Sequence, residues 1–254
     1  MRASATAGPK GGQPVIFQQM IQFIQDPQNT FATHTTDYLK LCFFSIALAV
    51  VIGIALGIAG AQRPALAFVA TNLTGLARAI PTLAFLAIGL LYFRLGIGFR
   101  PSALALTLLG IPPVLLNTIA GLRGIDPAAV EAGRGMGMTA GQLLWRVRVP
   151  LVLPVVAAGV RTSAVQIVAT APLAALIGGG GYGDYILLGI NLLQTAPLLV
   201  GAGCVAALAL LVEAGLAAVQ RAVTPVGLRV GVQAEEIGPG DVAPSAPPSE
   251  PVAA

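Results

Sequence analysis

Charged residues are scarce in this sequence. They make up 9% of its 254 residues, against about 25% in an average soluble domain, whereas hydrophobic residues make up 56%. No acidic residue occurs between Asp37 and Asp126. A surface in contact with water cannot be built from so few charges, so the composition predicts an integral membrane protein.

Clustered basic residues are also missing. The formal net charge of +4 is spread thinly along the chain, and only two of the residues are lysines. Attraction to the phosphates of a nucleic acid needs grouped Lys and Arg side chains. We therefore expect no nucleic acid among the partners of this protein.

Side chains that could carry catalysis or bind a metal are few. Cys42 and Cys204 both lie in apolar runs, where small packed or lipid-facing residues are expected rather than a disulfide or a metal pair. The single histidine, His34, has no second His, Cys or acidic cluster near it, so a solvated side chain is expected. No nucleophile elbow, zinc signature or Walker motif occurs. The sequence predicts no catalytic residue, no metal and no cofactor bound by this chain.

Long apolar runs are what the sequence does contain. A helix needs about 20 mostly apolar residues to cross a bilayer, at about 1.5 Å of rise per residue. The segment Pro64–Phe93 is short for two crossings and long for one, and Arg78 and Pro81 interrupt it, so we expect one tilted, kinked helix. Five spans are predicted, at about 39–60, 64–93, 101–122, 150–177 and 194–218, and six are the alternative. The predicted fold class is all-α and polytopic.

The two ends of the chain differ from the spans. In Val15–Ile24, four apolar side chains fall on one helical stripe opposite glutamines, and the segment is too short to cross a bilayer. We expect this helix to lie along the membrane interface, within an N-terminal segment of residues 1–38. Residues 223–254 are rich in Pro, Ala, Ser, Glu and Gly, which predicts a disordered tail. The stripe consists of Phe17, Met20, Ile21 and Ile24.

A charged loop, residues 123–149, separates two of the apolar runs. Asp126 followed by Pro127 is typical of a helix N-cap and first turn, because proline has no amide hydrogen to lose there. We expect Gly137 to end this first helix.

A second short helix is predicted to follow at once. Thr139 and Gln142 have the spacing of a capping box, in which each side chain bonds the other's backbone amide. Pro150 is expected to limit this helix. The loop is therefore predicted to form two short helices joined by a glycine bend at the membrane edge.

Positive charges indicate which side of the membrane the loop faces, because cytoplasmic loops carry an excess of Lys and Arg. With three spans before the loop and two after it, a cytoplasmic loop places the N-terminus outside and the C-terminus inside. The basic residues that agree are Arg63, Arg123, Arg134, Arg146, Arg148, Arg221 and Arg229. Those that count against this topology are Arg2, Lys10, Lys40, Arg94 and Arg100.

The loop also carries a motif of fixed positions, formed by Glu131, Ala132, Gly133, Gly137, Val147, Val149 and Pro150. The motif resembles the EAA loop of binding-protein-dependent ABC importer permeases, which reads E-A-A, three residues, G, nine residues, I-x-L-P. Gly133 replaces the second alanine, Val147 the isoleucine and Val149 the leucine. Similarity extends over roughly Lys40 to Ala222 and is strongest to the branch that imports glycine betaine, choline, carnitine and related quaternary amines.

The resemblance implies a methionine-importer-like permease fold in the inner (cytoplasmic) membrane of a bacterium. It implies that a separate ATP-binding cassette subunit binds ATP and magnesium and receives the loop. An extracytoplasmic binding protein would deliver the solute, and a second permease subunit, identical or similar, would complete the pore. The residues implied in coupling to the ATPase are Glu131, Ala132, Gly133, Gly137, Trp145 and Pro150.

The loop residues have properties that fit this role. Glu131 lies one turn into its helix, where a carboxylate is favoured and can meet a cation on a partner. Gly133 and Gly137 are expected to keep one helix face small, and Trp145 can anchor an interface. In the alternative interpretation, Glu131 pairs with Arg134 along its own helix, and Trp145 lies in the lipid interface.

Polar side chains inside the predicted spans are candidates for the solute pathway or for helix packing. Arg161 lies about eleven residues into its span, where a charge normally faces a partner or a water-filled path. Glu213 could pair with it, although an arginine can also bond nearby carbonyls or extend towards the interface. The other candidates are Asn72, Arg78, Pro81, Asn117 and Gln166.

A glycine run follows the fourth predicted span. It lacks the Lys-Ser or Lys-Thr of a phosphate-binding loop, so we predict a tight external turn between the fourth and fifth spans. A part in an external gate or in docking of the binding protein is a hypothesis for this turn. Its residues are Gly178, Gly179, Gly180, Gly181 and Asp184.

The predicted function is that of the membrane-spanning permease subunit of an ATP-driven importer of small osmoprotectant quaternary amines. The alternatives are a permease for another small solute such as an amino acid, and an ion-coupled secondary transporter. The last would need paired acidic residues in the spans and an inverted repeat, and neither is evident. The aromatic residues are too sparse and scattered for an obvious quaternary-ammonium cage, so the substrate class depends on the resemblance.

Overall fold

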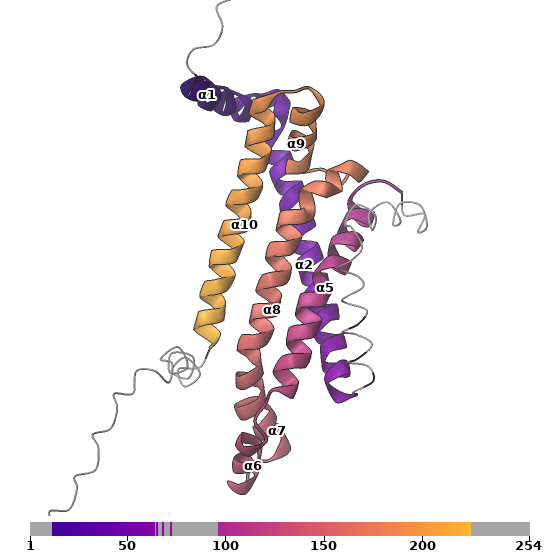
Figure 1. The fold of residues 1–254 in the computed structure, drawn as a ribbon, viewed down its shortest axis with the longest axis vertical. Helices are drawn as coiled ribbons and strands as arrows, with labels where there is room; N and C mark the ends of the chain where they lie inside the picture. Colours follow the sequence, from indigo (N-terminus) through magenta and orange to yellow (C-terminus); the bar gives the residue numbers. More distant parts are fainter. Residues whose placement is uncertain (1–11, 64, 66–67, 69–71, 73–95, 225–254) are drawn as a thin grey trace, which may run out of the picture.

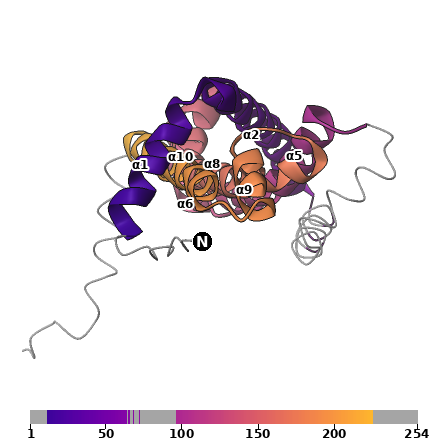
Figure 2. The ribbon, with the colours of Figure 1, turned by 90° about the horizontal axis from the view of Figure 1, so that it is seen from above.

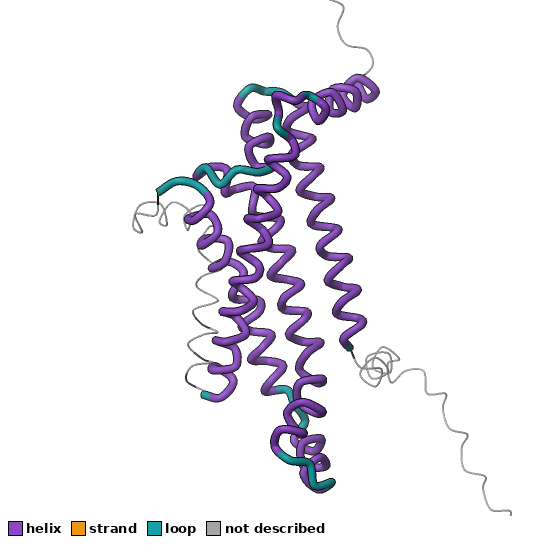
Figure 3. Tube along the Cα trace, turned by 180° about the vertical axis from the view of Figure 1, so that it is seen from behind, coloured by secondary structure: helices purple, strands orange, loops and turns teal. Residues whose placement is uncertain are grey.

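The computed structural model describes residues 12–63, 65, 68, 72 and 96–224, and every regular element among them is helical (Figure 3). The predicted all-α class is confirmed for this part of the chain. The segment predicted as the second span, with Arg78 and Pro81, lies almost wholly outside the described residues, as does the tail from residue 225. The elements are α1 (Gly12–Gln25), η1 (Pro27–Asn29), α2 (Phe31–Gln62), α5 (Phe99–Arg123), α6 (Pro127–Gly135), α7 (Ala140–Leu143), η2 (Leu144–Arg148), α8 (Val149–Thr170), η3 (Ala171–Ile177), α9 (Tyr182–Asn191) and α10 (Thr195–Val223).

Four helical segments of the described chain are long and apolar enough to cross a membrane. They lie side by side along the long axis of the molecule, with α1 and α9 at one end and α6 and α7 at the other (Figure 1). The segments are Pro27–Gln62, Phe99–Arg123, Ala140–Ile177 and Thr195–Val223.

Helices α2 and α5 run in the same direction and pack closely through glycines. A Cβ added to Gly53 would lie 2.7 Å from Val114 Cβ, and one added to Gly57 would lie 2.5 Å from Thr118 Cβ. At their shared end, Arg123 donates a hydrogen bond to the carbonyl oxygen of Gly60 at 3.2 Å. Small residues allow this close approach, which is how helices gain packing energy where water cannot drive them together.

Helix α8 runs antiparallel to α5 and meets it at Gly159. A Cβ at that position would lie 2.6 Å from Asn117 Cβ and 2.8 Å from the carbonyl oxygen of Pro113. Ser163 of α8 donates to the carbonyl oxygen of Gly110 at 2.7 Å, so a buried hydroxyl is satisfied across the same interface.

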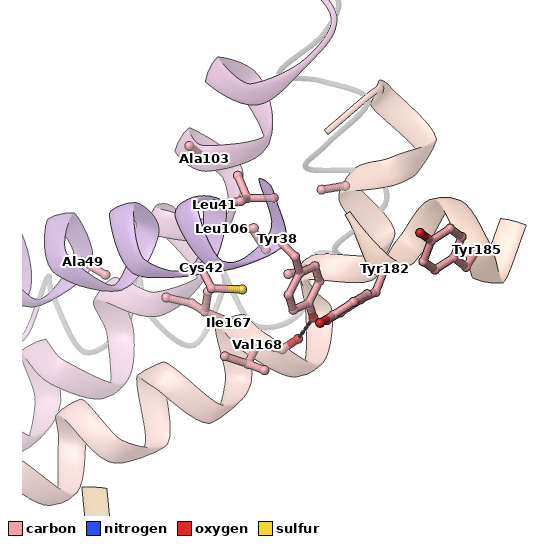
Figure 4. Close-up of a cluster of buried hydrophobic side chains, with 12 residues drawn as sticks. Tyr38, Leu41, Cys42, Ala49, Ala103, Leu106, Ile167, Val168, Tyr182 and Tyr185 are labelled. Atoms are coloured by element: carbon pink, nitrogen blue, oxygen red, sulfur yellow. Dashed lines mark hydrogen bonds between the residues drawn. The ribbon is translucent and has the colours of Figure 1, made fainter. Parts of the chain in front are cut away.

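The main buried cluster joins α2, α5, α8, η3 and α9 near the α1 end of the molecule (Figure 4). Tyr38 of α2 is fully buried, and its hydroxyl donates to the carbonyl oxygen of Val168 at 2.6 Å. Cys42 is also buried here, as a packed small side chain with a free thiol, which confirms one of the two roles expected for it. The cluster fixes the start of α2 against the end of α8.

Two helix starts can be compared with the sequence patterns. Helix α10 begins at Thr195, where the last predicted span was expected to begin. Helix α2 begins at Phe31, well before the apolar run that predicts a span near residue 39. Hydropathy marks the part of a helix suited to lipid, and a polar first turn can extend the helix beyond that part.

Helix α1 is the short helix expected near the N-terminus, and it lies across the ends of the long helices (Figures 1 and 2). Its side chains Phe17, Ile21 and Ile24 are exposed, as an interfacial helix would leave them. Its place at a membrane interface stays a prediction.

Candidate functional site

The charged loop forms a bent helical projection at the end of the molecule opposite α1 (Figure 1). We call residues Asp126–Arg148 the elbow; it comprises α6, a bend, α7 and η2. Its first helix begins as expected, because the Asp126 carboxylate accepts the backbone N–H of Ala128 at 2.8 Å and Pro127 occupies the first turn.

Gly137 sets the end of α6. Its φ is +76°, a left-handed conformation that glycine adopts without strain. Its N–H donates to the carbonyl oxygen of Arg134 at 2.9 Å, and the N–H of Met138 donates to that of Gly133 at 3.2 Å. These two bonds form a Schellman motif, which confirms the predicted role of Gly137 as the residue that ends the helix.

Gly133 has a different role from the one expected. It is buried, and an added Cβ would lie 2.6 Å from Leu143 Cδ1. The small side of α6 therefore receives α7 of the same chain. The predicted small face permits close approach at Gly133, to Leu143, but Gly137 does not belong to that face because it lies beyond the end of α6.

The second short helix starts as predicted but does not stop where predicted. Both bonds of the capping box form, from Gln142 N to Thr139 Oγ1 at 3.4 Å and from Thr139 N to Gln142 Oε1 at 3.0 Å. Helix α7 then continues through η2, a π-helical turn, into α8. Pro150 lies in the first turn of α8 and does not limit the helix. The wider turn, in which Val149 N–H donates to the carbonyl oxygen of Leu144, carries the helix up to the proline.

Large apolar side chains are exposed on the elbow. Trp145 is 70% exposed, Met136 71% and Leu144 44%. Glu131 and Ala132 are also exposed, and no ion pair among the described residues involves Glu131, so the alternative pairing with Arg134 is not formed. The elbow thus exposes both a tryptophan, which can bury apolar surface on a partner, and a carboxylate without an ion pair, which can form a charged contact.

Arg161 and Glu213 form the predicted ion pair between α8 and α10. Arg161 Nε lies 3.0 Å from Glu213 Oε1. A third member, Gln220, was not predicted. Its Oε1 accepts from Arg161 Nη1 at 3.1 Å, and its Nε2 donates to the carbonyl oxygen of Pro154 at 3.5 Å. Glu213 and Gln220 are seven residues apart and share a helix face, a spacing that could have indicated the grouping.

No hydrogen bond or ion pair joins Asn72, Asn117 and Gln166, the other polar candidates that the structure describes. Asn117 donates to the carbonyl oxygen of Pro113 in its own helix at 2.8 Å and packs against Gly159, which is a helix-packing role. Asn72 donates to the carbonyl oxygen of Phe68 and is exposed. Gln166 is half-buried in α8.

The glycine run forms a turn against the starts of α2 and α5. Gly178, Gly180 and Gly181 have φ between +73° and +83°. An added Cβ would lie 2.6 Å from Ile97 Cγ2 at Gly178 and 2.8 Å from Tyr38 Cδ2 at Gly181. The prediction of a turn is confirmed, but it leads into α9, so a turn and a helix together precede α10, and Asp184 belongs to that helix.

His34 contacts Asp184 across this turn, with Nδ1 3.4 Å from Oδ2. The prediction of a solvated histidine is wrong, because its acidic partner lies 150 residues further along the chain. Burial raises the pKa of the Asp184 carboxyl, and His34 partly offsets that rise. Burial likewise raises the pKa of Tyr185 to about 12.

Aromatic side chains also gather here, contrary to the expectation that they are scattered. Tyr185 packs edge to face with Phe23 at 5.2 Å between ring centroids and stacks with Phe31 at 6.2 Å. Tyr182 lies 4.8 Å from Tyr38 (Figure 4). The rings contact one another, so the cluster attaches α9 to α1 and α2 and is not an open cage.

Relatives with known names cover most of the chain. It is 34% identical to the glycine betaine/carnitine/choline transport system permease protein OpuCB of Bacillus subtilis (strain 168), over 83% of this chain and 96% of the relative. It is 35% identical to the carnitine transport permease protein OpuCB of Listeria monocytogenes, over 83% and 95%. It is 34% identical to the osmoprotectant import permease protein OsmW of Salmonella typhimurium, over 82% and 99%.

Solved structures share the fold at lower identity. An inward-facing MetNI methionine ABC transporter chain matches with a TM-score of 0.66 and 21% identity, over 77% of this chain and 96% of that one. A chain of an amino acid ABC transporter with histidines matches with a TM-score of 0.65 and 20% identity, over 81% and 97%. These matches confirm the predicted methionine-importer-like permease fold.

A family of membrane transport components matches most of the chain, in agreement with the relatives and the solved structures. Residues 49–225 match the family described as binding-protein-dependent transport system inner membrane component. That range includes the elbow, the Arg161–Glu213 pair and the glycine turn. This chain belongs to the family of binding-protein-dependent transport system inner membrane components.

Proposed function

We propose that this protein is the permease subunit of an ATP-driven importer of small osmoprotectant quaternary amines such as glycine betaine, choline or carnitine. The observation that carries the proposal is identity of 34–35% over more than four fifths of the chain to permeases named for these solutes. The protein itself is proposed to be no enzyme. ATP and magnesium would be bound by a separate ATP-binding subunit, and a second permease subunit would complete the pore.

The elbow supports the coupling role within this proposal. It projects from the end of the helices, it is held by its own caps, and it exposes Trp145, Met136 and Glu131. A well-ordered projection with an aromatic anchor suits a groove on a partner protein. Residues Ala132, Gly137 and Pro150 would act through the shape of the elbow and not through direct chemistry.

The basic residues near the elbow support its cytoplasmic placement. Arg123, Arg134, Arg146 and Arg148 lie in or beside it, as the positive-inside rule favours for the cytoplasmic side. The α1 end would then face outwards, towards the protein that delivers the solute. The proposed location is the cytoplasmic membrane of a bacterium.

Transport in proteoliposomes tests the function. The chain is reconstituted with its ATP-binding subunit and its extracytoplasmic binding protein, and uptake of radiolabelled glycine betaine, choline and carnitine is measured. We expect uptake that requires ATP inside the vesicles and the binding protein outside. Amino acid uptake in place of amine uptake would contradict the substrate class, and uptake by this chain without the ATPase would contradict the whole proposal.

A further inference from the structure

A polar pocket lies between α1 and the first turn of α10, at the end of the molecule opposite the elbow. Its volume is about 400 Å³, within the range of about 300–1,000 Å³ seen for ligand pockets in proteins. Amide side chains from both helices line it, together with one carboxylate and one aromatic ring. These side chains include Gln19, Gln22, Phe23, Asp26 and Gln194.

Asp26 differs from the other carboxylates near this end. Asp184 Oδ2 lies 3.4 Å from His34 Nδ1, and Asp37 Oδ1 lies 3.9 Å from Lys40 Nζ. Within the described ranges, no ion pair involves Asp26, and its one side-chain hydrogen bond is accepted from Gln28 N at 2.9 Å. The pocket therefore carries a negative charge that no basic group of the described chain balances.

The rest of the lining suits a cation that carries N–H groups. The Phe23 ring is packed edge to face with Tyr185, and aromatic faces attract cations, guanidinium above all. Gln19 and Gln22 are exposed, and their amide oxygens can accept hydrogen bonds from N–H groups. Gln194, the N-cap residue of α10, makes no side-chain capping bond, so its amide is also available.

The helix dipole of α10 opposes binding of a cation, but its charge is smaller than that of Asp26. The start of α10 carries the positive end of the helix dipole, equivalent to about half an elementary charge. Asp26 carries a full negative charge. The balance favours a cation placed beside Asp26 and Phe23, away from Thr195.

We propose that this pocket receives an arginine or lysine side chain of the extracytoplasmic binding protein and so helps to dock it. The family is described as binding-protein-dependent. The pocket lies at the α1 end of the molecule, which faces outwards in the proposed topology. The inference rests on that orientation. A single long basic side chain fits an open pocket lined by amides, an aromatic ring and a carboxylate.

The test compares two carboxylates at the same end. The complete transporter, with its ATP-binding subunit, is placed in lipid nanodiscs, and the Kd of its binding protein is measured at low and high salt. Asp26→Asn removes the charge and keeps an N-cap residue, so η1 retains its capping bond. Asp37→Asn is the matched control, because Asp37 lies outside the pocket.

We expect Asp26→Asn to weaken binding about tenfold at low salt and to flatten its salt dependence, with less than about a twofold change for Asp37→Asn. Asp26→Lys should abolish docking of the wild-type binding protein. One Lys→Glu or Arg→Glu variant from a scan of the binding protein's surface should restore it. Such rescue identifies the docked side chain and excludes a folding defect.

Three results would overturn the proposal. The first is an equal Kd for wild type and Asp26→Asn, and the second is an equal loss with both variants. The third is direct binding of glycine betaine by the transporter without its binding protein, lost in Asp26→Asn, which would assign the pocket to the solute. Failure of the proposed function looks different, since the wild type would then show no ATP-dependent uptake whatever residue occupies position 26.

Discussion

Gly135 and Gly137 lie two residues apart in the elbow and meet different structural demands. Gly135 is the last residue of α6, has an ordinary φ and has open space where a Cβ would go. Gly137 has a φ of +76°, also with open space. A side chain at Gly137 is therefore opposed by backbone conformation alone.

Gly137→Ala is expected to destabilise the bend by about 1–2 kcal/mol, because a residue with a Cβ is strained in the left-handed region. Gly135→Ala should be neutral or slightly stabilising. The two variants are compared by the amount of ATP-binding subunit that co-purifies with each. The protease sensitivity of the elbow is measured in the same samples. Equal recovery with both variants would show that the shape of the bend does not matter for coupling.

The Arg161–Glu213 pair is suited to a double-mutant cycle. Arg161→Leu and Glu213→Leu, singly and together, should show a coupling of about 0.6 kcal/mol and at most about 1.7 kcal/mol in thermal or denaturant unfolding, the average and the maximum for interhelical polar contacts in membranes. A Gln220→Ala variant should lower the coupling, since Gln220 also bonds Arg161. Strictly additive effects would mean that the pair contributes no packing energy.

At this scale, local chemistry was predictable, and long-range pairing was predictable only for charges inside the spans. The caps at Asp126, Thr139 and Gly137 follow from residues close in sequence, and the structure forms all of them. The contact of His34 with Asp184 joins residues 150 apart, and only the folded chain brings them together. Arg161 with Glu213 was predictable because charges inside lipid are rare and need partners.

Among elements, the contact of α5 with α8 depends on a missing side chain. Gly159 leaves no room for a methyl group, because the nearest atoms belong to the Asn117 stem and the Pro113 backbone. Neither can rotate away as the end of a flexible side chain would.

Gly159→Ala is expected to cost about 1–3 kcal/mol, the usual cost of overpacking. Gly203→Ala in α10 is the matched control, because a Cβ there meets nothing within 4 Å and alanine favours a helix by about 0.5–1 kcal/mol. Thermal unfolding midpoints of both purified variants in one detergent give the comparison. A lower midpoint for Gly203→Ala than for Gly159→Ala would contradict the packing described for α5 and α8.

The helix boundary expected at Pro150 could not be predicted from the proline alone. Proline usually limits a helix, yet Pro150 lies within a continuous helical segment, because a π turn precedes it. The sequence holds no simple signal for a π turn. The start of α2 at Phe31 was also not predicted, because its first turn is polar and hydropathy does not detect it.

For the whole molecule, opposite ends are predicted to face opposite sides of the membrane. In a chain with Cys42 and Cys204 replaced, Ala140→Cys should react with a membrane-impermeant maleimide only from the cytoplasm, and Gln18→Cys only from outside. Both positions are exposed in the structure. Labelling of position 140 by the impermeant maleimide in intact cells would contradict the proposed topology.

The helix that runs from Ala140 to Ile177 has a mechanical consequence. Its 38 residues connect the elbow to the glycine turn without an intervening loop, through the π turn at Leu144–Arg148, helix α8 and the 3-10 helix η3. In the proposed importer, a movement of the elbow by a partner would therefore be passed along α8 to the glycine turn without crossing a loop. Because thermodynamic coupling is reciprocal, a protein docked at the α1 end of the proposed importer would equally change the affinity of the ATP-binding subunit for its nucleotide.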